Sequence, residues 1–322
     1  MILAFVLLIV GFVLLVKGAD VFVDGSSSIA KFLKIPSIII GLTIVAFGTS
    51  APEAAVSIIA GINGSNDIAV GNVIGSNMFN LLVVIGISAL IKPVTVKDQI
   101  IKREFPFMLL VTGALVLMSY DVFFRNSAEN IISSSDAFIL LLFLAVFLYS
   151  VISSALRSRK ESLSSASEDD EKPRYGMGLS ILFTIGGLAG IVIGGQFVVD
   201  SAEKIALGFG MSETLVGLTI VALGTSLPEL VTSIVAARKG ESDIAMGNVV
   251  GSNVFNILFV LAASAAISPM GINAQCLGDL LILMAASVIA YLFCAVGKQV
   301  NRIEGLIMVL IYGGYMAYAI IR

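Results

Sequence analysis

The chain has 322 residues, of which 58% are hydrophobic and only 13% are charged, and its net charge is −3. A soluble domain would be about one quarter charged, so the composition excludes a soluble globular protein. The absence of histidine removes the commonest catalytic base near neutral pH, and the small net charge gives no sign of a nucleic-acid partner.

Apolar runs of roughly twenty residues recur along the chain, and each is long enough to cross a bilayer as a helix. They predict an all-α polytopic membrane protein rather than a β-barrel, whose strands would alternate in short segments. The first run lacks the basic start and cleavage site of a signal peptide, so we expect it to be a membrane span. We predict ten spans, at residues 2–28, 37–62, 67–91, 104–121, 135–155, 177–206, 213–237, 243–267, 277–297 and 303–321.

Residues 157–175 are charged, rich in serine and almost free of apolar side chains. They predict a solvated, flexible linker between two five-span halves, residues 1–156 and 176–322. Fifteen of the 19 lysines and arginines follow odd-numbered spans. The positive-inside rule therefore places the linker in the cytoplasm and both termini outside the cell.

Residues 41–80 align without a gap with residues 217–256, and 26 of the 40 positions are identical. The aligned residues lie in spans 2 and 3 (37–91) and in spans 7 and 8 (213–267). Because each half has an odd number of spans, the two copies would cross the membrane in opposite directions, as an inverted-topology repeat. The offset of 176 residues also matches Asp24 with Asp200. These two are candidates for lining an access path, or for snorkelling or capping their helices.

The sequences GTSAPE (48–53) and GTSLPE (224–229) place polar residues within apolar spans. Pro52 and Pro228 each lack an N–H, and each ring clashes with the carbonyl one turn earlier, so both helices should be discontinuous. Broken helices at membrane depth are tolerated where they line a cavity or contact protein. A cation would satisfy three kinds of group at these breaks. They are the freed carbonyls, the carboxylates of Glu53 and Glu229, and the hydroxyls of Thr49, Ser50, Thr225 and Ser226.

The segment DIAVGNVIGSNMFN (67–80) recurs as DIAMGNVVGSNVFN (243–256). Residues four apart share one helix face, so each copy presents two amides and one hydroxyl together. That face suits ion ligands, or interhelical hydrogen bonds that pack the helices, and the glycines four residues apart favour close packing. The residues are Asn72, Ser76 and Asn80 in the first copy and Asn248, Ser252 and Asn256 in the second.

A carboxylate in the middle of a membrane costs about 3 kcal/mol or more without a partner. Lys17 is the only basic residue that lies away from the ends of the apolar spans, and it cannot neutralise both Glu53 and Glu229. We expect these glutamates to face each other and to bind a hard cation that takes six to eight oxygens, above all Ca²⁺, although a protonated structural glutamate is an alternative. Cys276 and Cys294 have no metal-binding spacing and are expected to be packing residues, which argues against zinc or copper.

These motifs resemble the two α-repeats of the cation/calcium antiporter superfamily, and most closely its prokaryotic sodium/calcium exchanger branch. The resemblance implies a four-helix core from spans 2, 3, 7 and 8, four cation sites, and long tilted spans 1 and 6 that slide against the core. The family often has Asp where this chain has Asn256, which leaves two carboxylates rather than three and alters the expected stoichiometry and pH dependence. The ligands it implies are Glu53, Glu229, the carbonyls of Ala46 and Ala222, the hydroxyls of Thr49, Ser50, Ser76, Thr225, Ser226 and Ser252, and the flanking Asn80 and Asn256.

We therefore expect a secondary antiporter of the plasma membrane that exchanges Na⁺ for Ca²⁺ by alternating access. We expect it to work as a monomer in the lipid bilayer, without a cofactor, and not to be an enzyme. A proton-coupled Ca²⁺ exchanger that uses the same glutamates is the alternative. A cation channel fits less well, because channels repeat around a pore in subunits of one topology.

Overall fold

The computed structural model describes residues 2–125, 128–164, 173–211 and 222–322. Within these residues, seven helices are long and apolar enough to cross a membrane, and a bent pair of shorter helices makes up to eight. The predicted polytopic helical membrane protein is therefore confirmed. Two predicted spans are not among the eight: 104–121 forms a shorter helix, and 213–237 lies partly outside the described residues.

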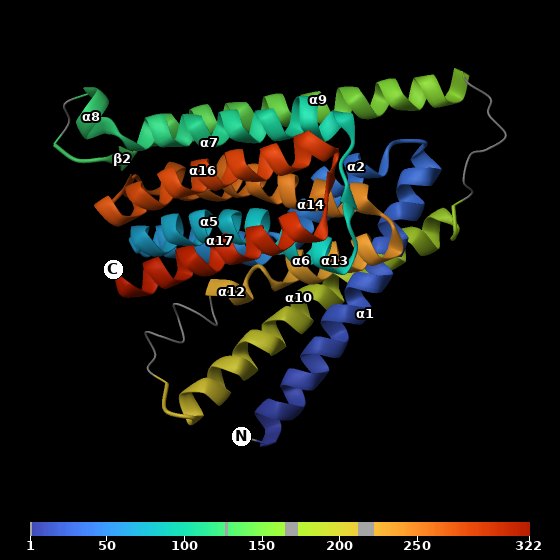
Figure 1. Cartoon of the computed structure of the whole chain (residues 1–322), viewed down its shortest axis with the longest axis horizontal. Coiled ribbons are helices and arrows are strands. Elements are labelled where there is room, and N and C mark those ends of the chain that lie inside the picture. The colour runs from blue at the N-terminus through green and yellow to red at the C-terminus, as the bar shows by residue number, and fades with distance from the viewer. Residues whose placement is uncertain (1, 126–127, 165–172, 212–221) are drawn as a thin grey trace.

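The first half of the chain begins with the long helix α1 (Ile2–Leu33), and its remaining elements are shorter (Figure 1). Three of them are π-helical segments, labelled η. The elements are α2 (Ser37–Ile40), η1 (Gly41–Val45), α3 (Ala46–Thr49), α4 (Ala51–Ile62), α5 (Asn66–Phe79), η2 (Asn80–Val84), α6 (Ile85–Ile91), β1 (Val94–Thr95), η3 (Ile100–Glu104), α7 (Phe105–Ser119), α8 (Asp121–Arg125), β2 (Ile131–Ile132) and α9 (Ser134–Ser164).

The second half begins with the long helix α10, which contacts α1. Its elements are α10 (Met177–Gly208), α12 (Ala222–Gly224), α13 (Leu227–Lys239), α14 (Ser242–Phe255), η5 (Asn256–Leu261), α15 (Ala262–Ile267), β3 (Met270–Gly271), α16 (Ala274–Gly297), β4 (Gln299–Val300) and α17 (Arg302–Ile321). Helices α5, α7, α9, α14, α16 and α17 run in roughly the same direction across Figure 1, whereas α1 and α10 cross them obliquely.

Helix α9 continues to Ser164, into the segment that was predicted to be a flexible loop. Arg157 donates a 3.0 Å hydrogen bond to Glu161 one turn later, and such pairs stabilise exposed helices. The expectation of a loop is wrong for residues 157–164, because a polar segment can be helical where a preceding apolar helix has already formed the nucleus. Residues 165–172 lie outside the described part of the chain.

Two short antiparallel strand pairs join loops that are distant in sequence. Strand β1 pairs with β4, which joins the loops after predicted spans 3 and 9. Strand β2, at the left end of Figure 1, pairs with β3 and joins the loops after predicted spans 4 and 8. Loops after odd-numbered spans therefore meet one another, as do loops after even-numbered spans.

Helices α1 and α10 pack closely because glycines line their contact. A Cβ atom at Gly18 would lie 2.8 Å from the main-chain nitrogen of Ile191, and one at Gly187 would lie 2.6 Å from that of Phe22. A Cβ at Gly11 would lie 2.9 Å from the carbonyl oxygen of Gly194. The residue numbers on α10 decrease as those on α1 increase, so the two helices are antiparallel. Their main chains approach more closely than residues larger than glycine would permit.

We expect Gly187→Ala to destabilise the protein by about 1–3 kcal/mol, because the added methyl group would meet main-chain atoms that cannot yield. The midpoint of thermal aggregation in detergent measures this effect. Gly313→Ala in α17 is the matched control, since its added Cβ would meet nothing within 4 Å beyond its chain neighbours and the backbone of its own helix. Equal midpoints for the two variants would contradict the close-packing explanation.

Candidate functional site

Both GTS sequences lie at breaks between helices, as the prolines predicted. Helix α3 ends at Thr49, Ser50 has φ −83° and ψ 8°, and α4 starts with Pro52 in its first turn. The chain bends by 50° at this break. The second copy has the same arrangement, with Ser226 at φ −93° and ψ 6° and Pro228 in the first turn of α13.

The two glutamates are fully buried, and each is bound by a serine from the other half of the chain. Ser226 donates a 2.8 Å hydrogen bond to Glu53 Oε1, and Ser50 donates a 2.7 Å hydrogen bond to Glu229 Oε1. The two polar motifs therefore meet in the structure.

The serines of α5 and α14 complete this cluster. Ser76 Oγ lies 3.1 Å from Ser226 Oγ, and Ser252 Oγ lies 3.5 Å from both Glu229 Oε1 and the carbonyl oxygen of Ala46. Hydroxyl and carbonyl oxygens thus surround the carboxylates from four helices. The candidate partner Lys17 is exposed on α1, so it does not neutralise the glutamates.

Several buried oxygens have no hydrogen-bond donor among the described residues. They include Glu53 Oε2, Glu229 Oε2, Asn80 Oδ1 and Asn256 Oδ1, and these four residues are fully buried. A buried, unpartnered carboxylate oxygen carries a large desolvation cost. A hard cation fits this set, because carboxylate and amide oxygens are its preferred ligands.

Asn80 and Asn256 each begin a π-helical segment, η2 and η5. A π-helical turn contains an additional residue, which changes the direction of the side chains at that point, and such turns are frequent at functional sites. Asn256 Nδ2 donates a 3.1 Å hydrogen bond to Asn77 Oδ1, which leaves its own Oδ1 as a ligand candidate. Within the described residues, no group of three Asp, Glu, His or Cys side chains could hold a metal, so a third carboxylate does not complete the site.

Thr49 donates through Oγ1 to Val45 O or to Asn248 Oδ1, both at 3.0 Å, and its oxygen is fully buried. Thr225 is half-buried in the turn between α12 and α13. Ala222 is the first residue of α12, and the structure describes only its main chain. Ala46 and Ala222 thus begin the equivalent helices α3 and α12, and Thr49 and Thr225 lie just before the equivalent helices α4 and α13.

Asn72 and Asn248 hold the glutamate helices rather than facing the unpartnered oxygens. Asn248 Nδ2 donates to the carbonyl oxygen of Glu229 at 3.4 Å and to Ser233 Oγ at 3.0 Å. Asn72 makes the same contacts to Glu53 O, at 3.3 Å, and to Ser57 Oγ, at 2.8 Å. Of the two alternatives for this face, interhelical hydrogen bonding is correct at these two positions.

Sequence reasoning missed Asn77 and Asn253. Each donates through Nδ2 to the other's main-chain carbonyl, at 3.2 Å and 3.3 Å. These reciprocal bonds join α5 to α14 beside the site. The signal was the identity of GSN in both copies, but the four-residue spacing drew attention to the neighbouring face instead.

The profile of the sodium/calcium exchanger protein family matches residues 3–153 and 179–321. The chain belongs to this family. The inner membrane protein YrbG of Escherichia coli is 38% identical to this chain, with 99% and 96% of the two chains covered. The sodium/calcium exchanger MaX1 of Methanosarcina acetivorans is 33% identical, with 97% of each chain covered.

A solved structure of the sodium-calcium exchanger NCX_Mj, soaked with Na⁺ and without Ca²⁺, superimposes with a TM-score of 0.84. It is 31% identical, and 98% of each chain is covered. The predicted superfamily is confirmed, as are ion transport rather than enzymatic activity and a multi-pass membrane location. In this family Na⁺ and Ca²⁺ are cargo rather than cofactors.

We expect Asn248→Ala to weaken Ca²⁺ binding about tenfold, because loss of a buried hydrogen-bond donor costs about 1–3 kcal/mol and leaves the Glu229 main chain less constrained. Calorimetric titration of the detergent-solubilised protein measures this affinity. The control is Asn273→Ala, which removes the N-cap of α16 at the surface. Equal affinities in the two variants would show that Asn248 does not position the site.

Proposed function

We propose that this protein is a secondary antiporter that exchanges Na⁺ for Ca²⁺ by alternating access. The observation that carries the proposal is the pair of fully buried glutamates, each with an unpartnered oxygen, enclosed by hydroxyl and amide oxygens. The family match and the likeness to NCX_Mj support the two ions as cargo. The site lies within one chain, which supports a functional monomer in the bilayer.

An arrangement of ten spans in two inverted halves explains why several contacts occur in pairs. The two contacts of a pair have residue numbers that differ by 176. The offset converts the Ser50–Glu229 bond into the Ser226–Glu53 bond. It also converts the Gly11–Gly194 contact into the Gly18–Gly187 contact of the antiparallel helices α1 and α10. Both pairs of equivalent contacts are those expected for two halves related by a pseudo-two-fold axis in the membrane plane, with discontinuous helices beside the axis.

The loops support an orientation. The loops that follow predicted odd-numbered spans meet through the β1–β4 pair and through the 2.5 Å ion pair of Lys97 with Asp243. The same loops hold most of the lysines and arginines. The positive-inside rule then places this end and the linker 157–175 in the cytoplasm, and both termini outside.

The ion ligands follow from the unpartnered oxygens and their neighbours. Glu53 and Glu229 supply two negative charges, which balance one Ca²⁺ or two Na⁺. The remaining oxygens come from Ala46, Thr49, Ser50, Ser76 and Asn80, and from the equivalents Ala222, Thr225, Ser226, Ser252 and Asn256. A third Na⁺ would leave a net positive charge in the site, so it would make each cycle sensitive to membrane voltage.

Coupling follows from the cost of a buried charge. Two bare carboxylates resist passage through a closed, dry intermediate, because desolvated charge is expensive. Bound cations remove that cost, so the site changes access when it is filled by either ion. This penalty prevents leak and enforces exchange.

A proton-coupled Ca²⁺ exchanger is the second candidate, because protons on Glu53 and Glu229 would also neutralise the empty site. The abundance of neutral hydroxyl and amide oxygens around the carboxylates favours Na⁺ over protons, since protonation would need none of them. A channel is not favoured, because the carboxylates are fully buried.

We expect ⁴⁵Ca²⁺ uptake into proteoliposomes loaded with Na⁺, and none into vesicles loaded with K⁺ or acid. Glu53→Gln and Glu229→Gln should each lower uptake at least 100-fold, because one remaining carboxylate cannot balance a divalent cation. Glu129→Gln, at an exposed position, is the control and should retain full activity.

Uptake driven by a pH gradient alone would replace the sodium mechanism with the proton-coupled one. Uptake without any counter-ion gradient would contradict exchange and indicate a channel.

A further inference from the structure

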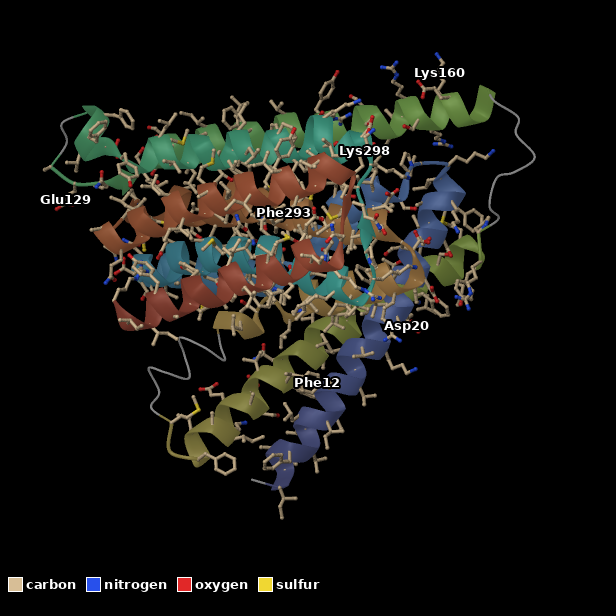
Figure 2. The ribbon with its side chains drawn as sticks, viewed as in Figure 1. Phe12, Asp20, Glu129, Lys160, Phe293 and Lys298 are labelled. Carbon is tan, nitrogen blue, oxygen red and sulfur yellow. The ribbon has the colours of Figure 1, made fainter. Side chains whose placement is uncertain are left out.

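Besides its contact with α10 along both halves, helix α1 meets the rest of the protein mainly along its second half. Its buried residues concentrate between Gly18 and Ala30, whereas large apolar side chains before Lys17 are mostly exposed. Figure 2 shows Phe12 on the half that extends away, and Asp20 where α1 meets the other helices. This second half of α1 ends at Leu33, at the end of the protein where the linker also lies.

A lysine at the end of α13 holds this half of α1. Lys239 Nζ lies 2.8 Å from Asp20 Oδ1 and 2.7 Å from Asp24 Oδ1, and it donates to the main-chain carbonyl of Asp20 at 2.7 Å. The side chains of Lys239 and Asp24 are only 23% and 18% exposed. Partial burial reduces solvent screening, so this network is stronger than an isolated surface ion pair.

A second contact lies one turn further along α1. Ser27 donates a 2.5 Å hydrogen bond to Glu241 Oε1, at the turn that joins α13 to α14. We call Asp20, Asp24, Ser27, Lys239 and Glu241 the ionic clasp. Arg174, just before α10, adds a 3.1 Å contact with Asp24.

The clasp acts on the helix that carries a proposed ion ligand. Helix α13 has Glu229 in its first turn and Lys239 as its last residue. A rigid helix therefore connects the clasp to the site, at roughly 15 Å for ten residues. Movement of α1 away from this turn would have to break the network of Lys239.

The other half of the chain cannot form the same network. The offset of 176 residues places Asn63, Gly64 and Ser65 at the positions of Lys239, Gly240 and Glu241. On α10 it places Gln196, Asp200 and Glu203 at the positions of Asp20, Asp24 and Ser27. The turn between α4 and α5 thus has no charged side chain with which α10 could pair.

We propose that the ionic clasp holds the linker end of the protein closed and makes the two alternating-access states unequal in energy. The proposal rests on the proposed function, in which the two states exchange the roles of α1 and α10. An inverted repeat with identical contacts would give two states of similar energy. Here the state with α1 attached has an ion network that the exchanged state lacks, so it is favoured in the absence of ions.

Distances between spin labels on α1 and on the core test the proposal without a transport assay. The labels replace Phe12 on α1 and Leu310 on α17, which are both exposed, in a background with Cys276→Ala and Cys294→Ala. We expect one dominant distance in the parent protein without ions. Lys239→Asn, which copies the residue at position 63, should add a second distance and change the ratio of populations at least threefold.

Two variants separate the clasp from general loss of charge. Lys239→Arg keeps the charge and should retain the parent distribution. Lys298→Asn is the matched control, because Lys298 pairs at 2.6 Å with Asp98, outside the ion pairs that Asp20 and Asp24 of α1 make with Lys239 and Arg174. Hydrogen bonds from Lys102 and Lys298 lower the pKa of Asp98 to about 2, so the Asp98 carboxylate is ionised at assay pH.

An unchanged distance distribution in Lys239→Asn would overturn the clasp, as would an equal change in Lys298→Asn. Because this readout requires no cargo, loss of Na⁺-driven uptake in the parent protein would contradict the proposed function and leave the clasp standing.

Discussion

The structure depends on the cost of placing two carboxylates, Glu53 and Glu229, in the interior of a membrane protein. Each accepts one hydrogen bond from the opposite half of the chain, and each keeps one oxygen without a partner. A structural role would favour full satisfaction of both oxygens, because half-satisfied buried groups destabilise the fold. Incomplete satisfaction within a close-packed region is what a site for a removable cation requires.

The surrounding elements fix these carboxylates at the expense of regular helix geometry. The breaks at Ser50 and Ser226 and the π-helical segments that begin at Asn80 and Asn256 lie at the same places in both halves. Each irregularity directs polar groups toward the site. The asparagine bonds then connect the irregular segments to regular helices, so the site is held although its own backbone is not uniformly helical.

The sequence predicted the parts of this arrangement that follow from local chemistry. Apolar length predicted the membrane helices, and the missing N–H of Pro52 and Pro228 predicted the breaks. The π-helical segments were not predictable, because an additional residue in a turn is stabilised by tertiary contacts and changes no composition. The end of α9 was missed for a related reason, since hydropathy does not distinguish an exposed helix from a loop.

The similarity of the two repeated segments and the differences in their surroundings have different physical consequences. The site requires symmetry, because its serines exchange partners under the 176-residue offset. Under the proposed alternating-access mechanism, control of access requires the opposite, since two equivalent states give a transporter no resting conformation. The proposed ligands are matched between the halves, whereas the turns differ, with Lys239 and Glu241 in one and Asn63 and Ser65 in the other. Charges at the end of α13 can therefore favour one conformation without changing the proposed ion ligands, which are the same in both halves. Ion selectivity and conformational preference would then depend on different residues.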